Sequence, residues 1–146
     1  MPQQDACDLL DADHRKVEML FGQYQSANDA TKSQLAQQIC AELVVHTTIE
    51  EEIFYPAFRE AAKDDKLVEE AKQEHQEARD LIAQIEDSEK PDALIAKLQE
   101  AIDHHVSEER AEMFPKARAT QGLDLLALAS RLEARKSELM ANVQKV

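Results

Sequence analysis

One pattern occurs twice in this 146-residue chain: a histidine, a glutamate four residues later, and a proline six residues after that. The two copies occupy residues 46–56 (HTTIEEEIFYP) and 105–115 (HVSEERAEMFP). The segments around His14 and His75, DADHRKVEMLF and KQEHQEARDLI, also align with each other. The chain therefore reads as two copies of one helical hairpin. Because neither copy can bury its apolar stripe alone, the two should close into a four-helix bundle.

Helical spacing of apolar residues supports this interpretation. Four long amphipathic stretches are separated by short polar breaks at residues 28–31, 62–65 and 87–91. Thr31 or Ser33 is expected to begin the second helix, and Gly122 is expected to precede a fifth one. We therefore predict a single all-α domain over residues 1–146. It comprises an up-and-down bundle over about 5–119 and an additional C-terminal helix over about 123–143.

Composition excludes several partners. The chain carries 30 acidic against 17 basic residues, a formal net charge of −13, which should repel nucleic acid and anionic lipid. Its start is polar, and no apolar run approaches the length of a membrane span. Cys7 and Cys40 lack metal-ligand spacing and are expected to be reduced. These features predict a cytoplasmic protein.

Histidine stands where a core residue belongs in each of the four stripes, and a glutamate follows one turn later in two of them. Burying two carboxylates beside four imidazoles is costly without a compensating cation. Six ligands are too many for one tetrahedral zinc, whereas carboxylate with imidazole suits two iron or manganese ions, roughly 3.5 to 4 Å apart. The candidate metal ligands are His14, His46, Glu50, His75, His105 and Glu109.

Other residues of the duplicated segments receive ordinary structural roles. Glu51, Glu52 and Glu108 lie beside the apolar stripe and are predicted to be solvated. Pro56 and Pro115 are predicted to kink or end their helices just past the ligand turn.

The segments DHRKVEMLF, HTTIEEEIFYP, EHQEARDLI and HHVSEERAEMFP resemble the four helices of the hemerythrin-like, HHE cation-binding domain, in its bacterial single-domain type. The resemblance covers roughly residues 9–116. It implies a hemerythrin-like bundle that holds two iron ions joined by an oxo or hydroxo bridge, with manganese or zinc as substitutes. By position, the four histidines would be terminal ligands, and Glu50 and Glu109 would bridge.

The sequence departs from the oxygen-carrying hemerythrins at one position. These carriers have a second histidine one turn after the third-helix ligand, where this chain has Arg79. Candidate replacement ligands are Glu18, His104 and Tyr55, and a solvent ligand is a further alternative. A cation cannot ligate iron, so we expect Arg79 to turn aside and pair with Glu18.

The leading functional hypothesis is a di-iron protein that binds or reacts with a small oxidant: dioxygen, nitric oxide or peroxide. Two alternatives remain open, an iron-sensing or iron-handling module without turnover and a metal-free helical interaction protein. We expect a binding protein more than an enzyme, with peroxide or nitric oxide chemistry at the metal pair as the enzymatic alternative. The expected partner is a small diatomic or peroxide ligand, with no nucleic acid or membrane, and the expected state is a monomer or weak homodimer.

Overall fold

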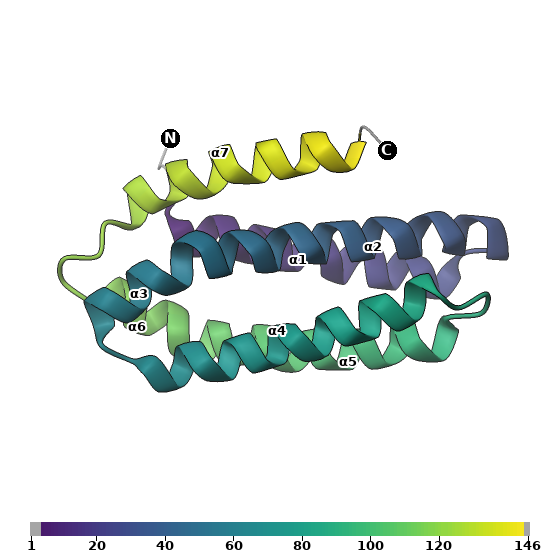
Figure 1. Cartoon of the computed structure of the whole chain (residues 1–146), viewed down its shortest axis with the longest axis horizontal. Coiled ribbons are helices and arrows are strands. Elements are labelled where there is room, and N and C mark those ends of the chain that lie inside the picture. The colour runs from purple at the N-terminus through teal and green to yellow at the C-terminus, as the bar shows by residue number, and fades with distance from the viewer. Residues whose placement is uncertain (1–3, 145–146) are drawn as a thin grey trace.

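The computed structural model describes residues 4–144, which form helices joined by short turns, without a strand in that range (Figure 1). The elements are α1 (Ala6–Ser26), α2 (Asp29–Ile49), η1 (Glu50–Phe54), α3 (Tyr55–Ala62), α4 (Asp65–Glu86), α5 (Asp92–Glu108), η2 (Glu109–Met113), α6 (Phe114–Ala119) and α7 (Leu125–Gln144). The second and fourth rods of the bundle are each continuous, α2–η1–α3 and α5–η2–α6. The predicted all-α, up-and-down bundle with an additional C-terminal helix is confirmed.

Polar side chains at the breaks define where the helices begin. Asn28 accepts a hydrogen bond from the backbone N–H of Thr31, so α2 begins ahead of the two residues predicted to start it. Asp64 caps α4 in the same way, by accepting a hydrogen bond from the backbone N–H of Leu67. Gly122 has a φ of 87° in the turn before α7, a left-handed conformation that glycine adopts without steric cost. These short connections keep neighbouring helices antiparallel.

Both long rods widen into a single π-helical turn before their proline. The N–H of Tyr55 donates to the carbonyl of Glu50, and the N–H of Phe114 donates to the carbonyl of Glu109, five residues back in each case. A proline has no N–H and its ring crowds the preceding turn, so a wider turn lets the helix continue. The rods therefore pass both prolines without ending, and each π turn begins at a glutamate of the predicted metal site.

The core consists of two apolar clusters with a polar layer between them. In α1, Leu10 belongs to one cluster and Val17 to the other, and His14 lies between them. In α2, Leu43 and Ile49 flank the equivalent layer in the same way. The polar layer is therefore held in the middle of the bundle by packed side chains on both sides.

The two cysteines are buried free thiols in these clusters. Burial raises the pKa of Cys7 to about 12 and the pKa of Cys40 to about 11. Both sulfurs therefore stay protonated at neutral pH, as expected for structural residues.

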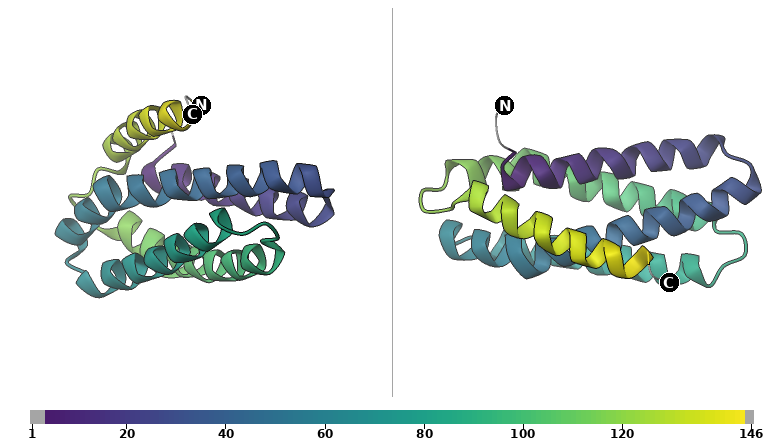
Figure 2. Two further views of the ribbon diagram at one scale, coloured as in Figure 1. Left: turned by 45° about the vertical axis from the view of Figure 1, so that its right-hand side comes forward. Right: turned by 90° about the horizontal axis from the view of Figure 1, so that it is seen from above.

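The C-terminal helix covers one side of the bundle. α7 packs on α1, α2 and η1, with α4 and α5 on the opposite side of the molecule (Figures 1 and 2). Leu128 and Leu132 of α7 are buried in the cluster around Phe54. Among residues 4–144, no helix has the length and apolar character that crossing a membrane requires.

Candidate metal centre

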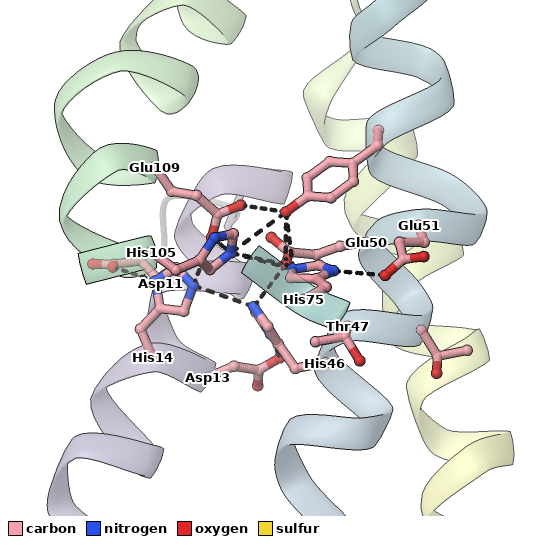
Figure 3. A network of polar contacts seen from close by, with 12 residues as sticks. Asp11, Asp13, His14, His46, Thr47, Glu50, Glu51, His75, His105 and Glu109 are labelled. Carbon is pink, nitrogen blue, oxygen red and sulfur yellow. Dashed lines mark hydrogen bonds and ion pairs between the residues drawn. The ribbon is translucent and has the colours of Figure 1, made fainter. Parts of the chain in front are cut away.

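Six ionisable side chains form the polar layer at the middle of the bundle. The exposed fraction of each is at most 4%. Four helices and two π turns contribute one residue each: His14 from α1, His46 from α2, His75 from α4, His105 from α5, Glu50 from η1 and Glu109 from η2 (Figure 3). The structure thus brings together all six residues that the duplicated pattern predicts as ligands.

The imidazoles form two pairs that turn the same nitrogen inward. Nε2 of His14 lies 3.2 Å from Nε2 of His46, and these two residues are called the first pair. Nε2 of His75 lies 3.2 Å from Nε2 of His105, and these are called the second pair. The rings of each pair meet edge to face, with centroids 4.8 and 4.7 Å apart. Each hairpin therefore supplies one pair of converging nitrogen ligands.

The two glutamates lie between the pairs. Oε1 of Glu50 is 3.2 Å from Nε2 of His46 and 3.1 Å from Nε2 of His75, one imidazole of each pair. Oε1 of Glu109 is 3.0 and 3.3 Å from the other two Nε2 atoms. Each carboxylate therefore lies within reach of ligand nitrogens from both pairs.

Two carboxylate oxygens of this layer indicate that metal ions would fit there. Oε2 of Glu50 and Oε1 of Glu109 are buried and accept no hydrogen bond of acceptable geometry, although the Nε2 atom of His14 lies close to the second of them. The ligand atoms of His14, His46, Glu50 and Glu109 all lie within 4.8 Å of one another, and so do those of Glu50, His75 and His105. Buried carboxylate oxygens without donors, surrounded by imidazole nitrogens, match the requirements of cations such as iron, manganese or zinc.

Without metal, protons supply the positive charge of the layer. Burial alone would lower the pKa of His46, but the charge of Glu50 and a hydrogen bond to Asp13 raise it to about 10. Burial would likewise raise the pKa of Glu50, but the neighbouring imidazoles, His46 first, hold it well below its usual value. The pKa of His105 is raised well above its usual value, chiefly because the charge of Glu109 outweighs burial. Imidazolium–carboxylate pairs therefore keep the metal-free bundle electrically compensated, and metal uptake must displace protons.

The outer nitrogen of every imidazole is held by a further carboxylate. A proton on Nδ1 donated to that carboxylate leaves Nε2 unprotonated in the neutral ring and turned toward the metal position. The four contacts are His14 with Asp11 at 3.1 Å, His46 with Asp13 at 3.0 Å, His75 with Glu51 at 2.7 Å, and His105 with Glu74 at 2.7 Å. The prediction that Glu51 is solvated was wrong: it reaches across from η1 to α4.

Comparison with known proteins agrees with this geometry. The sequence model described as the Hemerythrin HHE cation binding domain matches residues 5–117. This chain belongs to the hemerythrin HHE cation-binding family. No curated protein matches it. The buried histidine and glutamate clusters lie inside the matched range, and together with the family they indicate a metal-binding protein.

One solved structure supports the fold. It is the crystal structure of a Hemerythrin HHE cation binding domain-containing protein from Mycobacterium kansasii, an Rv2633c homolog, with a TM-score of 0.85 and 20% identity. The match covers 98% of this chain and 91% of that one. It therefore extends beyond the residues matched by the family and takes in the region of α7.

Tyr55 is the alternative ligand that lies in the metal centre of this HHE domain. Its hydroxyl is 3.1 Å from Oε1 of Glu50, 3.0 Å from Oε2 of Glu109 and 3.1 Å from Nε2 of His75. Burial, reinforced by the charges of the two glutamates, raises the pKa of Tyr55 well above its usual value. In the metal-free domain the phenol therefore stays protonated and can donate its single proton to either carboxylate.

The other two alternative ligands lie outside the metal centre. The carboxylate of Glu18 pairs with Arg110 at 3.0 Å near the surface. His104 has a side chain that is 67% exposed and faces Glu108 at 3.1 Å and Glu74 at 3.4 Å. Helix geometry explains this, because adjacent residues point about 100° apart, so His104 cannot share the inward direction of its neighbour.

Arg79 does not pair with Glu18, contrary to expectation. Its guanidinium donates to Glu51 at 2.6 Å, and Glu51 in turn accepts from His75. Glu18 and Arg79 occupy equivalent positions in the two repeats, as do Arg110 and Glu51, which each stand five residues before a proline. The same ion pair therefore joins the two hairpins of the HHE domain twice, with its charges exchanged, so the two equivalent residues face different partners.

Proposed function

We propose that this protein binds two iron ions, joined by an oxo or hydroxo bridge, and that it binds or reacts with a small oxidant. The observation that carries the proposal is the position of Glu50 and Glu109, each of which touches one imidazole from both pairs and keeps an oxygen without a hydrogen bond. Glu50 and Glu109 would be shared by the two cations, and each imidazole pair would hold one of them, which would make a mixed nitrogen and oxygen ligand set that suits iron.

A small cavity beside the imidazoles limits what can reach the site. It has a volume of about 10 Å³, roughly the space of one water-sized molecule. The four imidazoles line it together with apolar side chains from α1, α2 and α5: Val17, Leu43, Ile102 and Val106. An apolar wall of this size admits a diatomic molecule or peroxide more readily than a larger or charged substrate.

The iron pair would supply the electrons for chemistry with the oxidant, and the residues around it would set the conditions. Carboxylates on Nδ1 keep the imidazoles oriented, and the packed clusters above and below keep bulk water away. Tyr55 holds a proton within hydrogen-bond distance of both glutamates, opposite the apolar cavity wall. With Arg79 turned to Glu51, a ligand position near the second pair is left to solvent or the oxidant.

The test is metal analysis joined to spectroscopy. The purified chain is stripped, reloaded anaerobically with ferrous iron and analysed for bound iron, and its optical spectrum is followed on exposure to air and to nitric oxide. The proposal expects two irons per chain, a near-ultraviolet oxo-to-iron band after oxidation, and spectral changes with nitric oxide in the reduced state. Two bound irons that respond to no oxidant would favour an iron-handling role. A chain that binds no metal would contradict the proposal.

A further inference from the structure

α7 lies outside residues 5–117, which the family model matches. One of its side chains nevertheless contacts the carboxylate that orients His46. Nζ of Lys136 donates to Oδ1 of Asp13 at 2.5 Å, and Oδ2 of Asp13 accepts from Nδ1 of His46 at 3.0 Å. The side chain of Asp13 is 7% exposed. Both oxygens of a buried carboxylate are therefore occupied, one by the C-terminal helix and one by a ligand imidazole.

The equivalent position in the other repeat has a different partner, which does not come from α7. Asp13 and Glu74 each stand directly before a ligand histidine, and each accepts from the Nδ1 atom of the histidine on the following helix. The outer oxygen of Glu74 faces His104, an exposed side chain 3.4 Å away. α7 packs mainly on the α1–α2 hairpin, so it makes the two halves of the metal centre different.

A neighbouring residue of α7 shows which part of this contact is specific. Arg135 pairs with Glu52 of η1 through Nε at 2.8 Å and Nη2 at 3.3 Å. The Arg135 and Lys136 side chains are similarly exposed, 34% and 29%, and both tie α7 to the bundle. Glu52 accepts no hydrogen bond from an imidazole, however. Arg135 therefore anchors α7 without contacting a carboxylate that orients a histidine.

We infer that Lys136 is a positioning residue for the metal centre: it fixes Asp13, which holds His46 with Nε2 toward the metal. Through this contact the C-terminal helix sets the metal affinity of the first pair separately from that of the second pair. The inference rests on the proposed function, because it requires that the two pairs bind metal.

Two physical effects of Lys136 would act in opposite directions. Its charge lies near the metal position, so removing it would favour a cation there. Its hydrogen bond holds the carboxylate that orients the imidazole, and loss of such outer partners commonly weakens metal binding by about 10- to 100-fold. Without Lys136, Oδ1 of Asp13 would be a buried oxygen lacking a donor, and the carboxylate would rotate toward water. The orienting effect should dominate, so the sign of the change identifies the mechanism.

The experiment titrates the stripped full-length chain with cobalt(II) and follows the visible absorbance, which reports the coordination of each ion. Lys136→Met should weaken one of two binding steps by about 10- to 100-fold and leave the other within about twofold. Arg135→Met, which removes the same charge from the same helix, should change neither step. Lys136→Arg should restore the weakened step, and Lys136→Met should have little further effect once Asp13→Asn is present.

Several outcomes would overturn the inference. Unchanged or tighter cobalt binding by Lys136→Met would show that orientation does not dominate. Equal weakening of both steps, or the same weakening in Arg135→Met, would mean that docking of α7 matters and the Asp13 contact does not. Circular dichroism of the metal-free variants checks that each is folded. If the parent chain binds two ions and Lys136→Met binds them equally well, this inference alone is refuted. If the parent chain binds no ion, the proposed function is refuted as well.

Discussion

The guanidinium of Arg79 lies 2.6 Å from the carboxylate of Glu51, and the same carboxylate accepts from Nδ1 of His75. Arg79 therefore acts on the metal centre from outside, by holding the carboxylate that orients an imidazole. Desolvation would raise the pKa of Glu51, but its hydrogen bonds to His75 and Arg79 lower it. Arg79, the residue that departs from the oxygen carriers, thus supports the imidazole of His75 through Glu51.

Arg79→His should change how the reduced site handles dioxygen. An imidazole one turn beyond His75 could fill the open position, so we expect the reduced variant to hold dioxygen longer before autoxidising than the parent does. Stopped-flow spectra of the reduced proteins mixed with air measure the decay. Arg79→Gln is the matched control, because it removes the charge without adding a ligand. Identical decay in the parent and Arg79→His would remove this residue from the explanation.

His46→Ala and His105→Ala should each lower bound iron from two ions per chain to roughly one or fewer, because each removes a buried nitrogen ligand. His104→Ala should change iron content little, since its side chain is 67% exposed and points away from the site. Metal analysis after identical reloading compares the three variants. Loss of iron in the His104 variant with retention in the His105 variant would mean that the register of α5 is wrong.

Chelation should lower the melting temperature, and the gap between loaded and stripped protein should widen as the pH rises. The pKa of His46 is raised from 6.5 to about 10 in the metal-free fold, chiefly by Glu50 against the opposing effect of burial. Its contribution to stability is therefore complete below pH 6.5 and is lost as the pH rises toward 10. In the metal-loaded form the imidazoles would be neutral throughout this window, so its stability would not depend on this protonation. Calorimetry of both forms at several pH values in this window measures the gap. A metal-free midpoint that does not fall would show that these pairs are not protonated.

Tyr55→Phe should destabilise the metal-free bundle by about 1–3 kcal/mol, because the single phenol proton lies within reach of two buried carboxylates, and the one that accepts it would lose a hydrogen bond. The ring itself remains, so packing in the apolar cluster is preserved. Urea unfolding of stripped protein measures the free energy of unfolding. An unchanged value would contradict the donor role. A visible phenolate-to-iron band in the oxidised parent, absent from the variant, would show that Tyr55 becomes a ligand when iron binds.

The sequence by itself determined the bundle and its six central residues. Helical periodicity places His46 and Glu50 on one face, since residues four apart lie one turn above each other, and this local rule needs no knowledge of the neighbouring helices. The duplication then brings His105 and Glu109 to the same depth. Such residues are predictable because the backbone of their own helix fixes their direction.

Only the tertiary structure decided what holds these ligands in place. Thirty acidic residues offer many candidates for the Nδ1 atoms, and the rotation and offset of packed helices select among them. A repeat relates Glu18 to Arg79 as counterparts, which carries no information about whether they touch. The sequence does show that an acidic residue, Asp13, stands directly before His14. It holds no signal that Lys136 is the partner of Asp13. That contact joins residues 123 positions apart. It forms only when α7 packs on the completed bundle, and this packing depends on residues far away in the sequence.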